Sequence, residues 1–314
     1  MSVPAPIEIT PSRTAEVGGV QVRRALPRRA RRTVGAWCFA DHMGPLRSGS
    51  RRGNEVDASP DDPDSGVGVQ VGPHPHVGLQ TVTWLVAGEL LHRDSLGSEQ
   101  EIRAGQLNLM TAGHGVSHAE EQTGRRQGEL HGIQLWVAQP EATRHGAPAF
   151  EHHAQLPQIE LEATTATVLV GDFAGAVSPA RRDTNHVGAE LDMRPGRSVV
   201  PLLAGYEYAI VVLDGAVDLG ANQRVVPGEL AYLGAGRDEL AAATPEGARL
   251  LLLGGEPFES PILMWWNFVA RSREEMDSAR ADWEGGADGS GRFGDTGSLL
   301  ARIPAPATPW SPSS

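Results

Sequence analysis

Two stretches in the amino-terminal half decide the fold: "HPHVGLQTVTWLVAG" at residues 74–88 and "AGQLNLMTAG" at residues 104–113. Each has a counterpart in the other half, "PLLAGYEYAIVVLDG" at residues 201–215 and "PGELAYLGAG" at residues 227–236. In this alignment Gly78 corresponds to Gly205. Self-similarity at a fixed spacing is the signature of an internal repeat, so we predict a unit of roughly 120 residues that occurs twice.

Each copy consists of short apolar and β-branched runs separated by Gly, Pro, Asp and Asn, a pattern typical of β-strands. Many short strands between regularly spaced turns indicate a double-sheet jelly roll. The predicted fold is therefore all-β, with two tandem jelly-roll barrels in domains at residues 1–150 and 151–314. The polar segment at residues 47–66 is predicted to be a long surface loop.

One short helix is predicted near the carboxyl terminus, in "SREEMDSARADWEGG" at residues 272–286. Ser272 is a typical helix cap, acidic residues follow in the first turn, and glycines end the segment. The tryptophans Trp265 and Trp266 precede this helix, and we expect them to pack between it and the second barrel.

The composition excludes several classes of function. The net charge is −12, which argues against direct nucleic-acid binding through bulk charge. The chain contains no lysine, which excludes Schiff-base catalysis by lysine and a Walker-type phosphate loop. Six arginines lie within residues 22–32, either as a solvated strand edge or as a patch that binds a partner.

Compartment and assembly follow from weaker signals. No apolar run approaches the roughly 18 residues that a membrane span needs, and no signal peptide is recognised. The single cysteine, Cys38, excludes an internal disulfide and fits a reducing compartment, where we expect a buried, unreactive thiol. These features predict a cytoplasmic protein. A duplicated barrel buries its own faces, so we expect a monomer.

Four residues of the first copy form the candidate site: His74, His76, His118 and Glu120. Residues i and i+2 of a strand point to the same side of the sheet, so each pair can direct two side chains into one barrel. Pro75 lacks an N–H, so we expect its strand to be a sheet edge or to begin there. Three imidazoles and a carboxylate suit a divalent metal such as iron, nickel, manganese, zinc or copper, and leave two octahedral positions open. The alternative is a set of surface or hydrogen-bonded histidines.

The second copy tests this interpretation. The alignment places Pro201, Leu203, Ala241 and Ala243 at the four corresponding positions, and none of these side chains is a metal ligand. Polar residues that a barrel needs for folding should occur in both copies. We therefore interpret the four residues of the first copy as serving chemistry rather than folding. Ligand histidines must be neutral, so ordinary histidine pKa values predict metal loss as the pH falls through about 6.

Several further polar residues lie near these segments, and the sequence leaves their roles open. His92 and Asp94 form structural hydrogen bonds or support a metal ligand from behind. Asp41 and His42 are candidates for the mouth of the cavity. The remaining candidates are His131 and Gln134, either of which could orient a ligand.

The stretch at residues 74–121, together with "WCFADHMGP", "HGIQLWV" and "GRFG", resembles the pirin family, a branch of the cupin superfamily. The resemblance extends from about Arg24 to Gly294. It implies two cupin barrels with one metal, usually iron(II), in the first, and it assigns the ligand positions to the four residues selected above. Gln80, His114 and Val77 depart from the usual residues at their positions, which affects the surroundings of the site rather than the ligands.

The resemblance implies two possible functions. The first is a dioxygenase of the quercetin 2,3-dioxygenase type, in which a flavonol or similar small aromatic substrate binds the metal, its ring opens and carbon monoxide leaves. Glu120 would be the catalytic residue, because a carboxylate can accept the hydroxyl proton of the substrate. The second is a regulatory protein that binds a protein partner in a metal-dependent or redox-dependent way.

Overall fold

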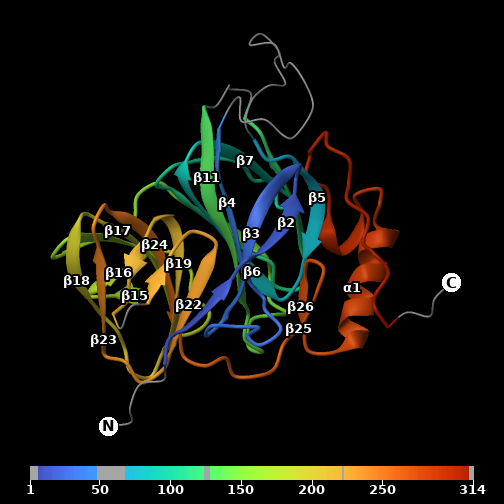
Figure 1. Cartoon of the computed structure of the whole chain (residues 1–314). Helices are drawn as coiled ribbons and strands as arrows, with labels where there is room; N and C mark the ends of the chain where they lie inside the picture. The colour runs from blue at the N-terminus through green and yellow to red at the C-terminus, as the bar shows by residue number, and fades with distance from the viewer. Residues whose placement is uncertain (1–5, 48–67, 124–127, 221–222, 311–314) are drawn as a thin grey trace.

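The structure is a computed structural model that describes residues 6–47, 68–123, 128–220 and 223–310 (Figure 1). The predicted surface loop at residues 47–66 falls almost wholly outside these ranges. Two β-barrels lie side by side, the first drawn in blue to green and the second in yellow to orange in Figure 1. The predicted fold class, two tandem jelly-roll barrels with a short carboxyl-terminal helix, is confirmed.

Each barrel consists of a seven-stranded sheet and a four-stranded sheet. In the first barrel the large sheet has the order β12-β9-β6-β11-β4-β3-β2 and the small sheet the order β5-β10-β7-β8. The strands of the first barrel are β2 (Arg13–Val17), β3 (Val20–Leu26), β4 (Trp37–Arg47), β5 (Val71–His76), β6 (Leu79–Ala87), β7 (Glu89–Asp94), β8 (Glu99–Arg103), β9 (Leu107–Thr111), β10 (Val116–Glu121), β11 (Glu129–Ala138) and β12 (Ala149–His153).

The second barrel repeats this arrangement, with the orders β1-β22-β19-β24-β17-β14-β13 and β18-β23-β20-β21. Its strands are β1 (Glu8–Pro11), β13 (Gln158–Leu161), β14 (Thr164–Val170), β17 (His186–Met193), β18 (Gly196–Pro201), β19 (Glu207–Gly215), β20 (Val217–Asp218), β21 (Arg224–Val225), β22 (Glu229–Gly234), β23 (Glu239–Thr244) and β24 (Ala248–Gly255). Two short hairpins complete the described strands: β15 (Asp172–Phe173) with β16 (Ala176–Val177), and β25 (Leu263–Trp265) with β26 (Phe268–Ala270).

The predicted repeat is therefore present in the topology, strand by strand. Matched glycines at the ends of β6 and β19 show its local cause. Gly88 has φ 84° and Gly215 has φ 71°, a left-handed conformation that favours glycine. Both copies thus use the same residue to turn the chain at the same place.

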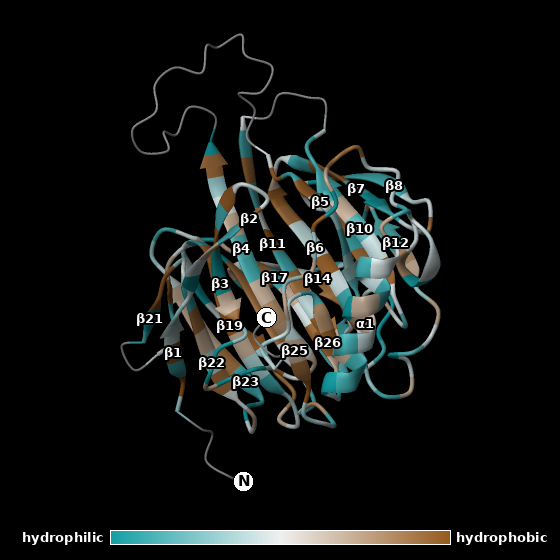
Figure 2. Ribbon diagram, turned by 90° about the vertical axis from the view of Figure 1, so that its right-hand side faces the viewer, coloured by the Kyte–Doolittle hydropathy of each residue, from teal (hydrophilic) through white to brown (hydrophobic). Residues whose placement is uncertain are grey.

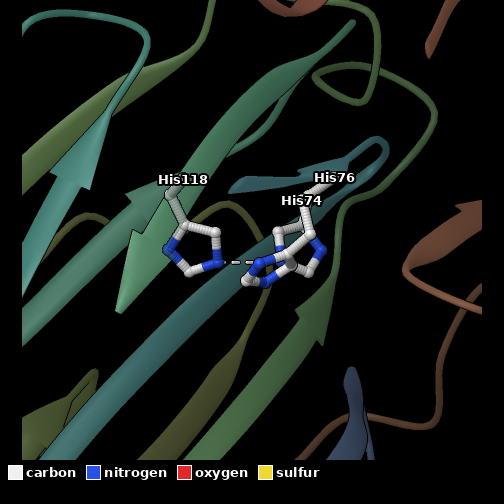
Figure 3. A group of neighbouring side chains, drawn as sticks. All are labelled: His74, His76 and His118. Atoms are coloured by element: carbon white, nitrogen blue, oxygen red, sulfur yellow. Dashed lines mark hydrogen bonds between the residues drawn. The ribbon is translucent and has the colours of Figure 1, made fainter. Parts of the chain in front are cut away.

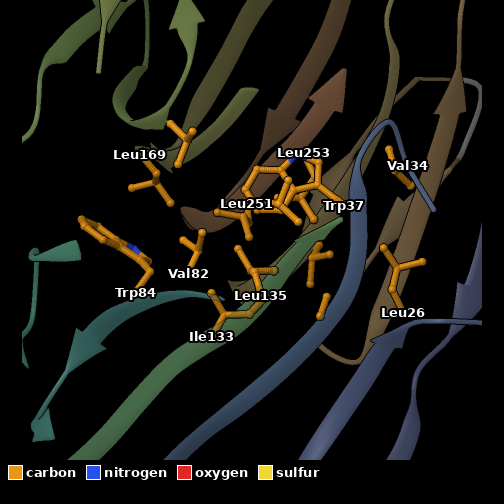
Figure 4. Close-up of a cluster of buried hydrophobic side chains, with 14 of the residues drawn as sticks. Leu26, Val34, Trp37, Val82, Trp84, Ile133, Leu135, Leu169, Leu251 and Leu253 are labelled. Carbon is orange, nitrogen blue, oxygen red and sulfur yellow. The ribbon is translucent and has the colours of Figure 1, made fainter. Parts of the chain in front are cut away.

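The two large sheets pack face to face, and the cluster between them draws side chains from both barrels (Figure 4). Trp37 of β4 is fully buried there beside Leu251 and Leu253 of β24. Its indole Nε1 donates to the carbonyl oxygens of Val187 (3.0 Å) and Gly254 (3.2 Å) in the second barrel. This side chain therefore fixes the first barrel against the backbone of the second.

The chain termini cross between the barrels. Strand β1, at the start of the chain, pairs with β22 of the second barrel. Conversely, the segment that contains β25, β26 and the helix lies against the first barrel, where Phe268 of β26 bridges to Val77. The domain boundary near residue 150 stays a prediction, but each barrel is completed by a strand or hairpin from the far end of the chain.

The predicted helix is α1 (Arg273–Gly285), and a short 3-10 helix, η1 (Gly291–Phe293), follows it. Ser272 caps α1 by accepting a hydrogen bond from the backbone N–H of Glu275. Its buried residues, Met276, Ala279 and Trp283, share one face at helical spacing, so the helix packs on the outside of the first barrel (Figure 2). Among the described residues, no helix is long and apolar enough to cross a membrane.

Candidate metal centre

The candidate site lies on the small sheet of the first barrel, where β5 and β10 are antiparallel neighbours. The register places His118 opposite His74, and Val116 opposite His76. Because i and i+2 share a face, both histidines of β5 point to the same side as His118. Strand β5 is an edge strand, which confirms the prediction from Pro75.

The three imidazoles converge inside the barrel (Figure 3). One ligand atom from each of His74, His76 and His118 lies within 4.8 Å of the others. The Nε2 atoms of His76 and His118 are 3.1 Å apart. All three side chains are buried, with exposed fractions of 7%, 1% and 1%. The alternative of surface histidines is therefore wrong, whereas its second form, hydrogen-bonded histidines, is not contradicted.

Hydrogen bonds from behind orient two of the rings. The Nδ1 atoms of His74 and His76 lie 2.9 Å from the carbonyl oxygens of Gly72 and Asn267, respectively. A carbonyl oxygen only accepts, so each Nδ1 carries the proton and each Nε2 keeps a free lone pair. The Nε2 lone pairs of His74 and His76 are buried and lie close together, so they can bind one divalent cation. The residues present therefore fit such an ion.

Burial also keeps these groups uncharged. It lowers the pKa of His74 to about 4, and it lowers the pKa values of His76 and His118 well below the usual value. The premise of ordinary pKa values behind the expected metal loss near pH 6 is therefore wrong. The imidazoles stay neutral, and available as ligands, in distinctly more acidic solution.

Glu120 follows His118 on β10, beyond an irregularity in the strand pairing that brings it opposite Val71. Its carboxylate does not belong to the group of atoms within 4.8 Å, but it lines the same cavity as the three histidines. Burial raises the pKa of Glu120 to about 7, against the effect of a hydrogen bond from Thr83. The role of Glu120 as a fourth ligand stays a prediction.

A cavity of about 510 Å³ opens above the histidines. Its wall includes Phe39 and Trp136, whose rings are stacked with centroids 4.0 Å apart. The Arg24 guanidinium also lines it and makes two hydrogen bonds to the Asp41 carboxylate, at 2.8 and 2.7 Å. The cavity wall thus combines flat aromatic surfaces with the Arg24–Asp41 ion pair.

One wall of this cavity is the segment 264–267 at the β25–β26 turn, which was not predicted from the sequence. Trp265 and Trp266 line the cavity and pack with Phe268 and the helix on the first barrel, so their predicted position against the second barrel is wrong. Asn267 supplies the carbonyl behind His76. No local pattern marks Asn267, because it is 191 positions from the histidine that it supports.

Four of the residues whose roles the sequence left open fall into two groups. Asp41 and Gln134 line the cavity, and Gln134 accepts a hydrogen bond from Thr83 at 2.8 Å. The other group faces elsewhere. His42 and His131 contact each other through Nε2 atoms 2.9 Å apart, and His114 is exposed, with Nδ1 3.0 Å from the Gly146 carbonyl.

The structure also shows the surroundings of Cys38 and of the arginine run. The predicted buried thiol is confirmed, since Cys38 is fully buried and burial raises its pKa to about 12. Part of the arginine run is paired within the chain, as Arg24 binds Asp41 and Arg31 lies 3.0 Å from Glu8.

Among the described residues of the second barrel there is no such cluster, although the alignment needs a correction. Strands β18 and β23 pair with Val199 opposite Ala241, and their buried residues are the next ones along, among them Val200, Leu240 and Ala242. The aligned positions Pro201, Leu203, Ala241 and Ala243 therefore point away from the core, one position out of phase. The inward-facing residues just named are apolar, so the contrast between the two copies holds.

Comparisons with known proteins agree with this geometry. The family model described as Pirin matches residues 19–137, and the Pirin C-terminal cupin domain matches residues 188–289. A Pseudomonas aeruginosa protein provisionally named a quercetin 2,3-dioxygenase is 44% identical over 95% of this chain and 90% of its own length. A pirin-like protein of Caulobacter vibrioides is 36% identical over 88% of this chain and 92% of its own length.

A solved structure extends the agreement to three dimensions. The crystal structure of quercetin 2,3-dioxygenase from Acinetobacter baumannii matches with a TM-score of 0.87 and 40% sequence identity, and the match covers 97% of this chain and 96% of that one. Both halves of the sequence and the whole fold lead to the same assignment: the chain belongs to the pirin family of the cupin superfamily.

Proposed function

We propose that this protein is a metal-dependent dioxygenase that binds a chelating aromatic substrate, such as a flavonol, at one iron(II). The observation that carries the proposal is the set of three buried, neutral imidazoles at the base of a cavity with aromatic walls. The relative from Acinetobacter baumannii, titled a quercetin 2,3-dioxygenase, supports the substrate class.

His74, His76 and His118 would hold the ion, and Glu120 would be the fourth ligand. Nickel, manganese, zinc and copper suit the same donors, so elemental analysis of protein from its native host decides the metal. When bound, the ion would supply Lewis acidity toward the substrate and dioxygen.

The protein side of the reaction is proton transfer and orientation. Burial raises the pKa of Glu120 to about 7 in the metal-free chain, and a carboxylate at this place would accept a hydroxyl proton from the substrate. The stacked rings of Phe39 and Trp136 form part of the cavity wall, where a planar substrate can lie against them. The Trp136 ring also contacts His76 edge-on, with centroids 5.1 Å apart. Trp136 would therefore contact the substrate and also help to hold the metal ligand His76 in place.

An aerobic assay tests the proposal. Iron-loaded protein is mixed with quercetin, and loss of the near-visible absorption band is followed together with release of carbon monoxide. We expect turnover in the wild type and none in His76→Ala. His114→Ala is the matched control, because His114 is exposed and contacts Gly146 rather than the centre, and it should retain full activity.

Wild-type protein that holds one iron per chain and leaves quercetin intact would contradict the proposal. Metal binding without turnover is the result that the regulatory alternative predicts, and a partner captured only by metal-loaded protein would support it. The cytoplasmic location and the monomeric state stay predictions of the sequence.

A further inference from the structure

A second pair of buried polar residues lies behind His118, on the strand next to β10. Strand β7 pairs with β10 so that Asp94 is opposite His118 and His92 is opposite Glu120. Both side chains are buried, with exposed fractions of 4% for His92 and 1% for Asp94. Neither lines the cavity, so neither is placed to touch a substrate.

The hydrogen bonds of Asp94 fix the proton on His92. The Oδ1 atom of Asp94 accepts the backbone N–H groups of Leu96 (2.9 Å) and Ser98 (3.0 Å). Its Oδ2 atom lies 3.0 Å from His92 Nε2. An ionised carboxylate only accepts, so His92 carries its proton on Nε2 and presents a lone pair at Nδ1.

That lone pair faces His118. The Nδ1 atoms of His92 and His118 are 3.4 Å apart, and the His92 ring is held by stacking on Phe150, with centroids 4.4 Å apart and planes 14° apart. Because His92 Nδ1 carries a lone pair, His118 Nδ1 must carry the proton and donate it to His92 Nδ1. The Nε2 atom of His118 then has a free lone pair, like the Nε2 atoms of His74 and His76. No proton therefore lies between the Nε2 atoms of His118 and His76, which are 3.1 Å apart, and a cation can be shared there.

We propose that Asp94 and His92 are positioning residues: through hydrogen bonds they set the tautomer and the orientation of His118, and so prepare its Nε2 to bind a metal. This inference rests on the metal site of the proposed function. Outer hydrogen bonds of this kind typically change metal affinity by about 10- to 100-fold. The structure supplies the same support to the other two ligands from backbone carbonyls, and only His118 receives it through a side-chain chain.

The variant Asp94→Asn tests the tautomer directly. Two backbone N–H groups converge on Oδ1, so the amide oxygen of Asn must stay there and the amide nitrogen must face His92. The nitrogen would donate to His92 Nε2, moving the His92 proton to Nδ1. His118 would then have to accept at Nδ1 and carry its own proton on Nε2, where it blocks the metal.

A double variant shows whether this effect passes through His92. Phenylalanine at position 92 keeps the ring stacked on Phe150 but neither donates nor accepts. His92→Phe alone should weaken metal binding less than Asp94→Asn, because His118 keeps the freedom to adopt the right tautomer. Adding Asp94→Asn to His92→Phe should have no further effect on affinity, which makes the two changes non-additive.

The matched control is a similar pair in the same barrel. His153 and Glu151 on β12 are also two residues apart, with Nε2 and Oε2 at 3.0 Å, and neither belongs to the three-histidine cluster or lines its cavity. Glu151→Gln replaces a carboxylate by an amide in an equivalent position. It should leave metal affinity unchanged.

Two measurements test the tautomers and the metal affinity. Nitrogen-15 NMR of the metal-free wild type at pH 8 should show His92 protonated on Nε2 and His118 on Nδ1. Nickel(II) affinity, measured by chelator competition on folded protein, should fall about 10- to 100-fold in Asp94→Asn.

Wild-type His118 with its proton on Nε2 would overturn the proposal, as would unchanged affinity in a folded Asp94→Asn protein or additive losses in the double variant. Wild-type protein that binds no metal at all would instead overturn the metal site itself, and the NMR result would still decide the tautomer.

Discussion

The pH dependence of metal binding follows from the burial of the donor groups, and the histidines and Glu120 behave oppositely. Burial lowers the pKa of His74 to about 4. At pH 5 about 90% of this imidazole therefore remains neutral, against roughly 3% for a histidine of ordinary pKa. The pKa values of His76 and His118 are lowered too. Proton competition at the histidines should thus cost little affinity between pH 8 and pH 5.

Glu120 changes this result if its carboxylate binds the metal. Burial raises its pKa to about 7, so about 90% is ionised at pH 8 and only about 1% at pH 5. A metal ligand must be deprotonated, so affinity should fall by roughly 90-fold over this range. In Glu120→Gln the affinity should be lower at pH 8 but nearly constant down to pH 5.

Nickel(II) affinity, measured at pH 8, 7, 6 and 5 with circular dichroism as a check on folding, tests both statements. Glu121→Gln is the matched control, because this neighbouring carboxylate lies 3.6 Å from Arg93 and does not line the cavity. It should behave like the wild type. A wild-type affinity that stays constant from pH 8 to pH 5 would exclude Glu120 as a ligand. A loss of roughly 30-fold or more that persists in Glu120→Gln would show that the histidines titrate normally.

Three further predictions concern stability. Metal at 100 times its dissociation constant should raise the free energy of unfolding by about 2.7 kcal/mol, while circular dichroism should show the metal-free protein folded. Trp37→Phe should lower the free energy of unfolding in urea by about 2–4 kcal/mol, because two buried carbonyls lose their donor and a small cavity opens. Burial lowers the pKa of His186 to about 4, and the unfolded chain binds its proton first as the pH falls. Stability from this group is therefore present above pH 6.5 and lost towards pH 4, by about 2–3 kcal/mol relative to a His186→Gln variant in urea titrations.

The fold was predictable because its cause is local and occurs twice. Turn glycines such as Gly88 and Gly215, with apolar runs between them, specify strands without reference to distant residues. The three histidines were predictable for the same reason. His74 and His76 are two residues apart on one strand, as are His118 and Glu120 on another, and this spacing places each pair on one face.

What the sequence did not predict depends on contacts between distant segments. Asn267 supports His76 from 191 positions away, and Trp266 reaches the cavity from a turn with φ 51°. The phase of the second copy was also out of reach, because Val200 and Pro201 are both apolar and only the pairing shows which of them faces the core. Hydropathy alone does not fix the phase of a strand whose two faces are alike.

The difference between the two barrels indicates why the first one contains buried histidines. In the second barrel the corresponding pair of strands closes over Val200, Leu240 and Ala242, which gain stability from burial and leave no polar atom unsatisfied. In the first barrel His74 and His76 each have a protein acceptor for Nδ1 and direct Nε2 into the cluster. With the tautomers described above, the Nε2 lone pairs of His76 and His118 face each other at 3.1 Å without a proton between them. A cation would satisfy the Nε2 atoms of all three histidines together, whereas the apolar packing of the second barrel needs no ligand. This is the physical reason for proposing that the centre serves chemistry and not folding.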